Sequence, residues 1–212
     1  QWFNVPKGKI LDPFAGGSVR GIVAAKLGFE YLGNDLRIEQ IEANRINANE
    51  VLGDAELHPV WTDGDSLNID KIADGYEADM IFSCPPYADL EVYSDLENDA
   101  SNQSDYQAFL QILKNAFSGA MQCLKNNRFA VVVVGDIRDK KGFYRCFPDD
   151  IKGIFKEHGM LFYNDIVLIE TAGTGALRAV PQMRNRKVVK CHQNVLVFYK
   201  GDPREIKNIY PK

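Results

Sequence analysis

A stretch near the start of the chain decides the fold, and it reads KILDPFAGG at residues 9–17. Its first residues are strand-like, Gly16 and Gly17 then break the strand, and a helical pattern follows over Ser18–Leu27. Glycine permits a tight turn there and leaves no side chain between the backbone and a ligand. A strand that breaks into a glycine turn before a helix is typical of α/β sheets that hold nucleotide-like ligands.

Strand and helix patterns alternate along the rest of the chain. This order predicts an α/β fold, with a mostly parallel seven-stranded sheet and helices on both faces. The apolar run Ala130–Val134 is typical of a central strand that is buried on both faces. No helix is expected between the last two strands, so they should form an antiparallel hairpin at the sheet edge. The expected strands are Lys9–Pro13, Tyr31–Asp35, Val60–Thr62, Met80–Ser83, Phe129–Val134, Met160–Glu170 and Asn194–Tyr199, and the expected helices are Ser18–Leu27, Glu39–Leu52, Asp105–Leu124 and Asp149–His158.

A second signal lies where the buried strand Met80–Phe82 should end, and it reads Ser83, Cys84, Pro85, Pro86 and Tyr87. Two prolines can neither continue a sheet nor enter a helix interior, so the backbone here is extended with an aromatic ring at its tip. Ligands of open α/β sheets bind outside the carboxyl ends of the strands. We call residues 83–87 the double-proline corner. The glycine turn and this corner are therefore expected to lie in one site.

An acidic residue follows each of the next two predicted strands. Asp35 lies about 20 residues beyond the glycine turn, where an acid can bind ribose hydroxyls. Asp65 follows the next strand. Each could instead be a helix cap or a turn residue, but their shared position after strands favours a ligand site. Nicotinamide enzymes also use a glycine turn, yet Gly16 and Gly17 are adjacent, so the glycine spacing of that class is absent.

On these motifs the chain resembles the amino-methyltransferases, which are S-adenosylmethionine-dependent enzymes that methylate exocyclic amino groups of DNA bases. The run Lys190–Phe198 also looks like the closing strand of phage and bacterial DNA methylases, some of which serve restriction-modification. The resemblance spans roughly Lys9–Asp202 and implies a Rossmann-like methyltransferase fold with S-adenosylmethionine as the cofactor. Asp35 would hold the ribose and Asp65 the adenine amino group, and the methionine part would lie on Asp12, Pro13, Phe14, Ala15, Gly16 and Gly17.

The resemblance also implies a catalytic role for the corner that contains Cys84, Pro85, Pro86 and Tyr87. In the family, the side chain before the first proline and a proline carbonyl accept hydrogen bonds from the target amine, and such preorganised groups supply a large catalytic effect. These positions are Cys84 and Pro85, and Tyr87 would stack on a base rotated out of the helix.

The family normally has aspartate, asparagine or serine where this chain has Cys84. A thiol is a weak acceptor, so Ser83 is an alternative. A nucleophilic Cys84, as in the cytosine carbon-5 methyltransferases, would need a lowered pKa, and no histidine lies nearby in sequence.

Composition limits the class of protein and its partners. The 212 residues carry a net charge of -4, so any contact with DNA must be local. No apolar run reaches the roughly 18 residues of a membrane helix, and no signal peptide opens the chain. The cysteines and histidines are scattered, which favours reduced thiols and no metal site. A cytoplasmic protein of one domain over residues 1–212 is expected.

Two basic stretches follow the central strand and the penultimate strand. Basic runs are often only solvated faces. These two runs, however, lie on loops at the end of the sheet where the ligand site is expected, which favours phosphate contacts. Phe143 and Tyr144 would either wedge into the base stack or only pin their loop. The residues expected to contact DNA are Arg138, Lys140, Lys141, Arg145, Arg178, Arg184, Arg186, Lys187 and Lys190.

Two further parts of the family pattern are expected to lie outside this chain, namely a leading cofactor-binding segment and a separate target-recognition domain. Specificity would then come from a partner or from a missing portion. The acidic segment Ala88–Ser104 is a poor phosphate binder, and we hypothesise that it is a flap over the base. The alternatives to a DNA amino-methyltransferase are an RNA or protein-glutamine methyltransferase, or a degenerate module that binds cofactor or nucleic acid without turnover.

Overall fold

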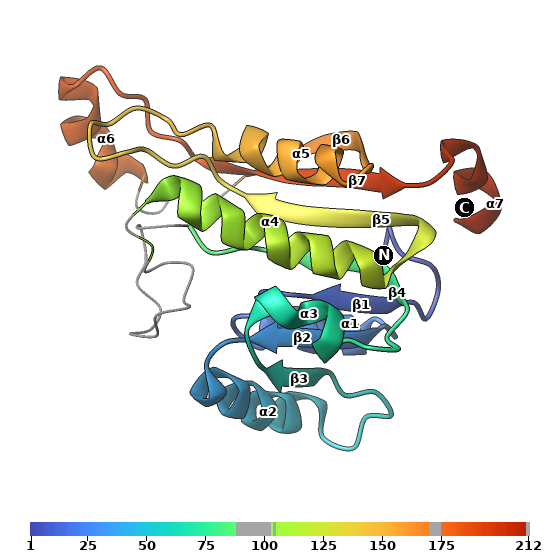
Figure 1. Ribbon diagram of the computed structural model, residues 1–212. Coiled ribbons are helices and arrows are strands. Elements are labelled where there is room, and N and C mark those ends of the chain that lie inside the picture. Colours follow the sequence, from blue (N-terminus) through green and yellow to red (C-terminus); the bar gives the residue numbers. More distant parts are fainter. Residues whose placement is uncertain (88–102, 104, 170–174, 211–212) are drawn as a thin grey trace.

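The fold comes from a computed structural model, which describes residues 1–87, 103, 105–169 and 175–210 (Figure 1). Seven strands of this part form one sheet in the order β3-β2-β1-β4-β5-β7-β6. Strands β1 to β5 pair in parallel, and β7 is antiparallel to both of its neighbours. The strands are β1 (Lys9–Asp12), β2 (Glu30–Asp35), β3 (Val60–Asp63), β4 (Ala78–Ser83), β5 (Leu124–Val134), β6 (Leu161–Ile169) and β7 (His192–Lys200).

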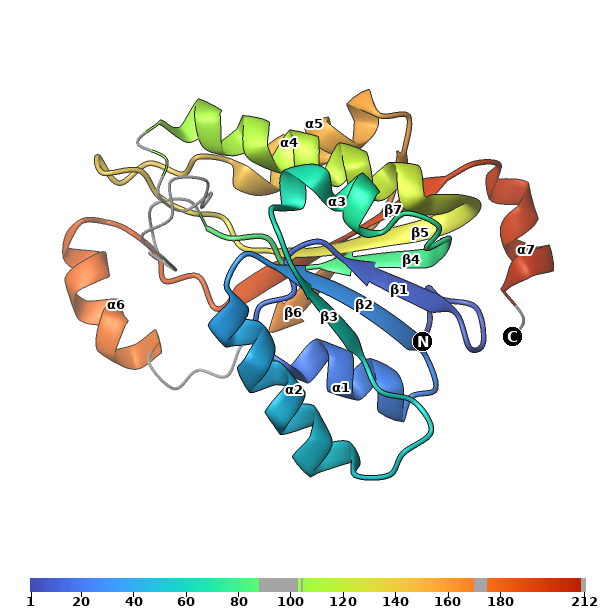
Figure 2. The same cartoon turned by 60° about the horizontal axis from the view of Figure 1, so that its bottom comes forward.

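Helices cover both faces of the sheet (Figure 2). Helices α1 and α2 lie on one face, and α3, α4 and α5 lie on the other. The helices are α1 (Val19–Lys26), α2 (Ile38–Leu52), α3 (Ile69–Ile72), α4 (Tyr106–Cys123), α5 (Phe147–Glu157), α6 (Gly175–Arg184) and α7 (Ile206–Ile209), with 3₁₀ turns at η1 (Ser66–Asn68) and η4 (Pro203–Glu205).

Each face of the sheet has its own hydrophobic core. On the α4 side, Phe109, Phe117 and Phe155 are fully buried against the central strands, and each such ring contributes about 2 kcal/mol of burial free energy. On the other side, Ile41 of α2 packs in a cluster with Trp61 of β3. The central strands are thus buried on both faces, as the run Ala130–Val134 predicts.

The predicted α/β architecture is confirmed, including the antiparallel pairing of the last two strands. Two expectations about elements were wrong. Helix α6 lies between β6 and β7. No helix was expected there, because Gly175 and Pro181 within this segment are helix-breaking residues. Strand β5 begins at Leu124 rather than at Phe129, because Leu124 pairs with Ala78 of β4 and a register irregularity separates this pair from Met80 and Phe129.

The carboxyl ends of the parallel strands lie together at one edge of the sheet (Figure 1). The loop after β5 and helix α6 both project from this edge in the two views. The predicted flap Ala88–Ser104 lies outside the described residues, apart from Gln103. The described segments at this edge are therefore the glycine turn, the double-proline corner, the loop after β5 and helix α6.

Candidate active site

The glycine turn after β1 is held by two neighbouring elements. Gly16 has a φ of +53°, a left-handed conformation that strains any residue with a side chain. Its amide donates to Oδ2 of Asp35 at 2.9 Å, and its carbonyl accepts a hydrogen bond from Asn44 of α2 at 2.7 Å. A carboxylate has about four acceptor positions, so Asp35 can hold this turn and still accept from a ligand. We call residues 13–18 the elbow.

Asp12 lies buried beneath the elbow. Its carboxylate accepts hydrogen bonds from Ser83 Oγ at 2.6 Å, Arg20 Nε at 2.7 Å and Tyr31 OH at 2.8 Å. Burial and the charge of Asp12 raise the pKa of Tyr31 well above its ordinary value. Burial opposes the charge of Arg20, but the carboxylate of Asp12 outweighs it and raises the pKa of the guanidinium. Asp12 therefore joins β1, β2, β4 and α1 below the site.

The double-proline corner follows β4, directly beside the elbow. Ser83 is fully buried, and its hydroxyl bonds to Asp12. The ring of Tyr87 packs edge-on against Phe147 at 6.1 Å between centroids. The Tyr87 hydroxyl accepts a hydrogen bond from the Gly135 amide at 3.0 Å. The tip of the corner is thus fixed to the end of β5 and the start of α5.

One pocket of about 320 Å³ lies between the elbow and the corner. It brings together most of the side chains that the sequence singled out, because the ends of β1, β2 and β4 meet at one edge of the sheet. The predicted residues that line it are Pro13, Phe14, Gly16, Gly17, Asp35, Asp65, Cys84, Pro85, Pro86 and Tyr87.

Three predicted site residues lie beneath the pocket rather than in its lining. Asp12, Ala15 and Ser83 are all fully buried. The hydroxyl of Ser83 is directed to Asp12 at 2.6 Å, so its geometry serves the junction of β1 with β4. Of these two residues, Cys84 lines the pocket and Ser83 does not.

Sequence reasoning missed several residues of the pocket lining. Arg20 donates to Asp12 and to the carbonyls of Phe14 and Ala15, so it closes the elbow from its helix side. The sequence pattern that could have identified Arg20 is an arginine in the first turns of a helix that follows a buried aspartate. The other missed lining residues are Asn34, Leu36, Arg37, Gln40, Ser66 and Ile112.

Asp65 does two things at once. Its Oδ1 accepts from the Leu67 amide at 2.9 Å and caps η1, which is the structural role that sequence reasoning kept open. It also lines the pocket next to Ser66, whose hydroxyl donates to the Pro13 carbonyl at 2.6 Å. The end of β3 is therefore tied to the elbow.

The lining suits a ligand with a polyol, a flat ring and a charged tail. Asp35 and Asp65 supply carboxylates on one side, and the left-handed glycine brings backbone within reach of the ligand. Gly17 has open space where a Cβ would stand, so a side chain there would enter the pocket. These groups fit S-adenosylmethionine, whose ribose hydroxyls need acceptors and whose methionine part needs close backbone approach.

The two basic stretches come together at the same edge. A Cβ on Gly142 would collide with Lys187, so the residue after α6 packs on the loop after β5. Lys140 and Lys141 are exposed at the tip of that loop, Arg184 is exposed at the end of α6, and Arg186 is exposed just after it. Lys190 instead bonds to Asn194 at 3.4 Å. The side chain of Arg178 lies outside the described part.

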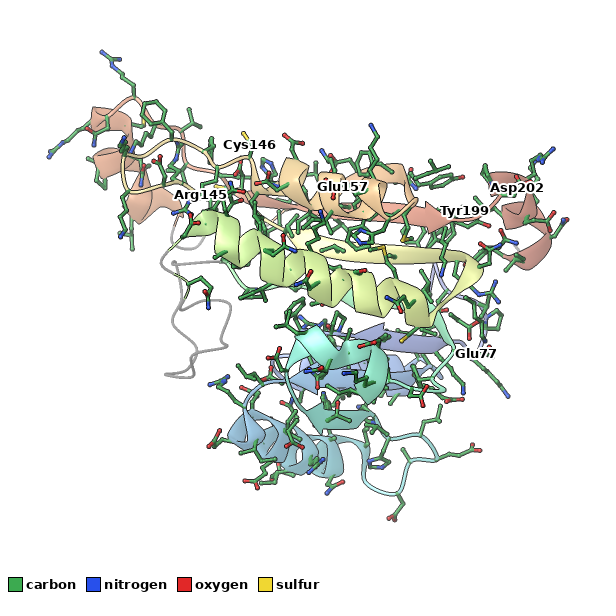
Figure 3. The ribbon with its side chains drawn as sticks, in the orientation of Figure 1. Glu77, Arg145, Cys146, Glu157, Tyr199 and Asp202 are labelled. Carbon is green, nitrogen blue, oxygen red and sulfur yellow. The ribbon has the colours of Figure 1, made fainter. Side chains whose placement is uncertain are left out.

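Arg138 and Arg145 are partly buried, and each lies over an aromatic ring. Arg138 lies over the ring of Tyr144 at 3.7 Å, and Arg145 lies over the ring of Tyr106 at 4.6 Å. Figure 3 shows Arg145 beside the amino end of α4 and close to Cys146. These two arginines brace their loop, and the exposed lysines are better placed for phosphates.

Among the described residues, no group of three His, Cys, Asp or Glu side chains could hold a metal ion. The helices of this same part include none with the length and apolar character needed to cross a bilayer.

Fold and pocket together define a Rossmann-like methyltransferase. The family model described as DNA methylase matches residues 78–211, which is more than half of the chain, so this protein belongs to the DNA methylase family. The methyl donor of the family is S-adenosylmethionine. No curated protein matches the sequence.

Solved structures share the fold at low sequence identity. A proposed DNA modification methylase from Thermus thermophilus aligns over 70% of this chain and 53% of its own, with 18% identity and a TM-score of 0.50. The present chain thus spans about half of that protein's length. A proposed rRNA methylase from Clostridium thermocellum aligns over 93% and 91%, with 15% identity and a TM-score of 0.58. Magnesium protoporphyrin IX methyltransferase from Synechocystis, solved with bound S-adenosylmethionine, aligns over 95% and 72%, with 11% identity and a TM-score of 0.57.

Proposed function

We propose that this protein transfers a methyl group to an exocyclic amino group of a DNA base, adenine N6 or cytosine N4, after the base has left the helix. The observation that carries the proposal is one pocket that the elbow and the double-proline corner both line. A methyl donor on the elbow side and an amine on the corner side would meet there. Membership of the DNA methylase family supports DNA as the acceptor.

The elbow side of the pocket would hold the donor. Asp35 would accept the ribose hydroxyls with the positions that Gly16 and Arg37 leave open. Asp65 would reach the adenine amino group, and Gly16 and Gly17 would lie against the methionine part. Asp12 and Arg20 would keep the elbow in shape without touching the ligand's reacting atoms.

The corner side would hold the amine. The lone pair of an exocyclic amine is delocalised into the ring, so the amine is a poor nucleophile. Acceptors at the Pro85 carbonyl and the Cys84 sulfur would bond its two protons and favour a tetrahedral nitrogen. When bound, S-adenosylmethionine would supply an electrophilic methyl group to the amine nitrogen with its thioether as the leaving group, and the amino proton released would pass to solvent. Tyr87 would stack on the base.

A three-acceptor assay tests this proposal. The protein is incubated with methyl-labelled S-adenosylmethionine and with unmethylated genomic DNA, total RNA or a protein extract, and the digests are read by mass spectrometry. We expect label in N6-methyldeoxyadenosine or N4-methyldeoxycytidine, which would also identify the base. Label found only in RNA, or only in protein glutamine, would contradict the DNA proposal.

Cys84 supports a second candidate, which is a module that binds cofactor and nucleic acid without turnover. A thiol accepts hydrogen bonds weakly, and this residue lines the pocket where the family has a stronger acceptor. The Cys84→Asn and Cys84→Asp variants distinguish the two candidates. A methyltransferase should transfer methyl faster in at least one of them, at unchanged cofactor affinity. If cofactor binds but neither variant nor wild type transfers methyl to any acceptor, the binding module is the better account.

A further inference from the structure

The loop after β5 is a short β-hairpin, which we define as residues 136–147. Arg138 and Tyr144 form an antiparallel bridge, and the Asp139 amide donates to the Phe143 carbonyl at 2.8 Å. The Asp139 side chain accepts from the Phe143 amide at 2.8 Å, and Gly142 turns the tip with a φ of +91°. The backbone of the tip is thus held from both strands of the hairpin.

Two adjacent aromatic residues near this tip have different surroundings. The ring of Tyr144 lies under the Arg138 guanidinium at 3.7 Å, so it pins the hairpin. The side chain of Phe143 is 72% exposed. Apolar side chains presented in this way can insert between the base steps of DNA.

The hairpin is anchored on the ring that we assign to the target base. The Gly135 amide, just before the hairpin, donates to the Tyr87 hydroxyl at 3.0 Å, and Phe147 at its other end packs edge-on against the Tyr87 ring. Asp136 closes the base of the hairpin, because its Oδ1 accepts from the amides of Ile137 and Phe147. The position of Phe143 is therefore fixed relative to the pocket.

The size and charge of the hairpin fit a DNA groove. Each arm has roughly four residues of about 3.3 Å, or ~13 Å in all, whereas the major groove is about 8.5 Å deep and admits a two-stranded β-ribbon. Lys140 and Lys141 flank the tip, and Lys187 packs on Gly142. Three cations beside one exposed ring suit phosphates around a site of insertion.

We propose that Phe143 is a wedge that enters the base stack of duplex DNA and helps the target base to leave it. This inference rests on the proposed function, since it gives that same site a means of opening the duplex. An apolar side chain between base steps unstacks them, and the opened position can then deliver its base to Tyr87. Single-stranded DNA needs no such opening.

The test compares methyl transfer to native unmethylated genomic DNA with transfer to the same DNA after heat denaturation. Phe143→Ala should lower the rate on duplex at least tenfold and change the rate on denatured DNA less than twofold. Phe143→Trp should restore the duplex rate. Leu177→Ala, which removes another exposed apolar side chain at the same edge, is the matched control and should leave both rates unchanged.

Each of the following outcomes would contradict the role of Phe143 as a wedge. Equal rates for Phe143→Ala and wild type on duplex would show that the ring does not open DNA. An equal fall on both substrates, with an unchanged melting temperature, would assign Phe143 to general binding. A wild type that methylates only denatured DNA would have no duplex to open. A wild type that methylates neither substrate would overturn the proposed function itself, and the wedge with it.

Discussion

At the scale of single residues, Tyr87 connects the corner with the hairpin. Its ring lines the pocket while its hydroxyl accepts from the Gly135 amide. The ring and the hydroxyl can therefore be separated by mutation, since phenylalanine keeps the first and removes the second.

We expect Tyr87→Ala to lower the rate of methyl transfer at least a hundredfold, while the Kd for S-adenosylmethionine changes less than threefold, because the ring faces the base. Tyr87→Phe should keep most of the activity, because it keeps the stacking surface. Single-turnover kinetics and calorimetric titration give the two quantities. A parallel loss of affinity and rate would assign Tyr87 to the cofactor side.

Asp35 should control affinity for the cofactor. Asp35→Ala removes the proposed ribose acceptor and the acceptor of the Gly16 amide, so we expect the Kd for S-adenosylmethionine to rise at least tenfold, or about 1.4 kcal/mol. Asp63→Asn is the matched control, because Asp63 ends the neighbouring strand on the surface. Calorimetry that finds equal affinities for wild type and Asp35→Ala would contradict the ribose assignment.

At the scale of elements, the elbow depends on a buried ion pair. Asp12 is fully buried, and Arg20 binds it at 2.7 Å while also donating to two elbow carbonyls. Removal of one member of a buried pair leaves an uncompensated charge, which costs more than the pair itself contributes.

Arg20→Met should therefore lower the free energy of unfolding by about 3 kcal/mol, as measured by urea denaturation. The double variant Arg20→Met with Asp12→Asn should recover part of this loss, because no charge is then left unpaired. If the double variant is less stable than Arg20→Met by the full cost of Asp12→Asn alone, the two side chains are not coupled.

The elements also show which parts of the fold the sequence predicts well. The sequence predicts the elbow and the corner because glycine and proline determine the local backbone. It predicts that they lie close together because the carboxyl ends of parallel strands meet on one side of the sheet. Helix α6 was not readable, since Gly175 and Pro181 indicate a loop. The inward roles of Asp12 and Ser83 were also hidden, because they depend on Arg20 and Tyr31 from other elements. Residues brought together only by packing leave no short pattern in the chain.

At the scale of the whole molecule, the two ends of the parallel strands have different roles. The pocket and the hairpin lie at the carboxyl ends of the strands, whereas a charge cluster around Asp79 lies at their amino ends. The Asp79 carboxylate accepts from the Lys9 amide at 3.1 Å, Lys125 at 3.1 Å and Arg128 at 3.0 Å. It therefore joins β1, β4 and β5 far from the proposed chemistry.

This cluster should make stability depend on pH. Burial opposes the charge of Asp79, but its three donors outweigh burial and hold the pKa of the carboxyl below its ordinary value. A lowered folded-state pKa gives stability that is present above about pH 4, the ordinary value for aspartate, and is lost as the pH falls through the folded-state pKa. Asp79→Asn should cost about 2 kcal/mol at pH 7, and this cost should shrink as the pH falls below about 4, by urea denaturation. A constant difference across this range would mean that the charge of Asp79 contributes nothing.

The most direct test of the account is a crystal structure of the protein with bound S-adenosylmethionine. We expect the ligand in the pocket between the elbow and the corner, with its ribose on Asp35 and its methyl group directed toward Cys84 and Pro85. A ligand bound elsewhere, or bound here with its methyl group turned away from the corner, would contradict the account.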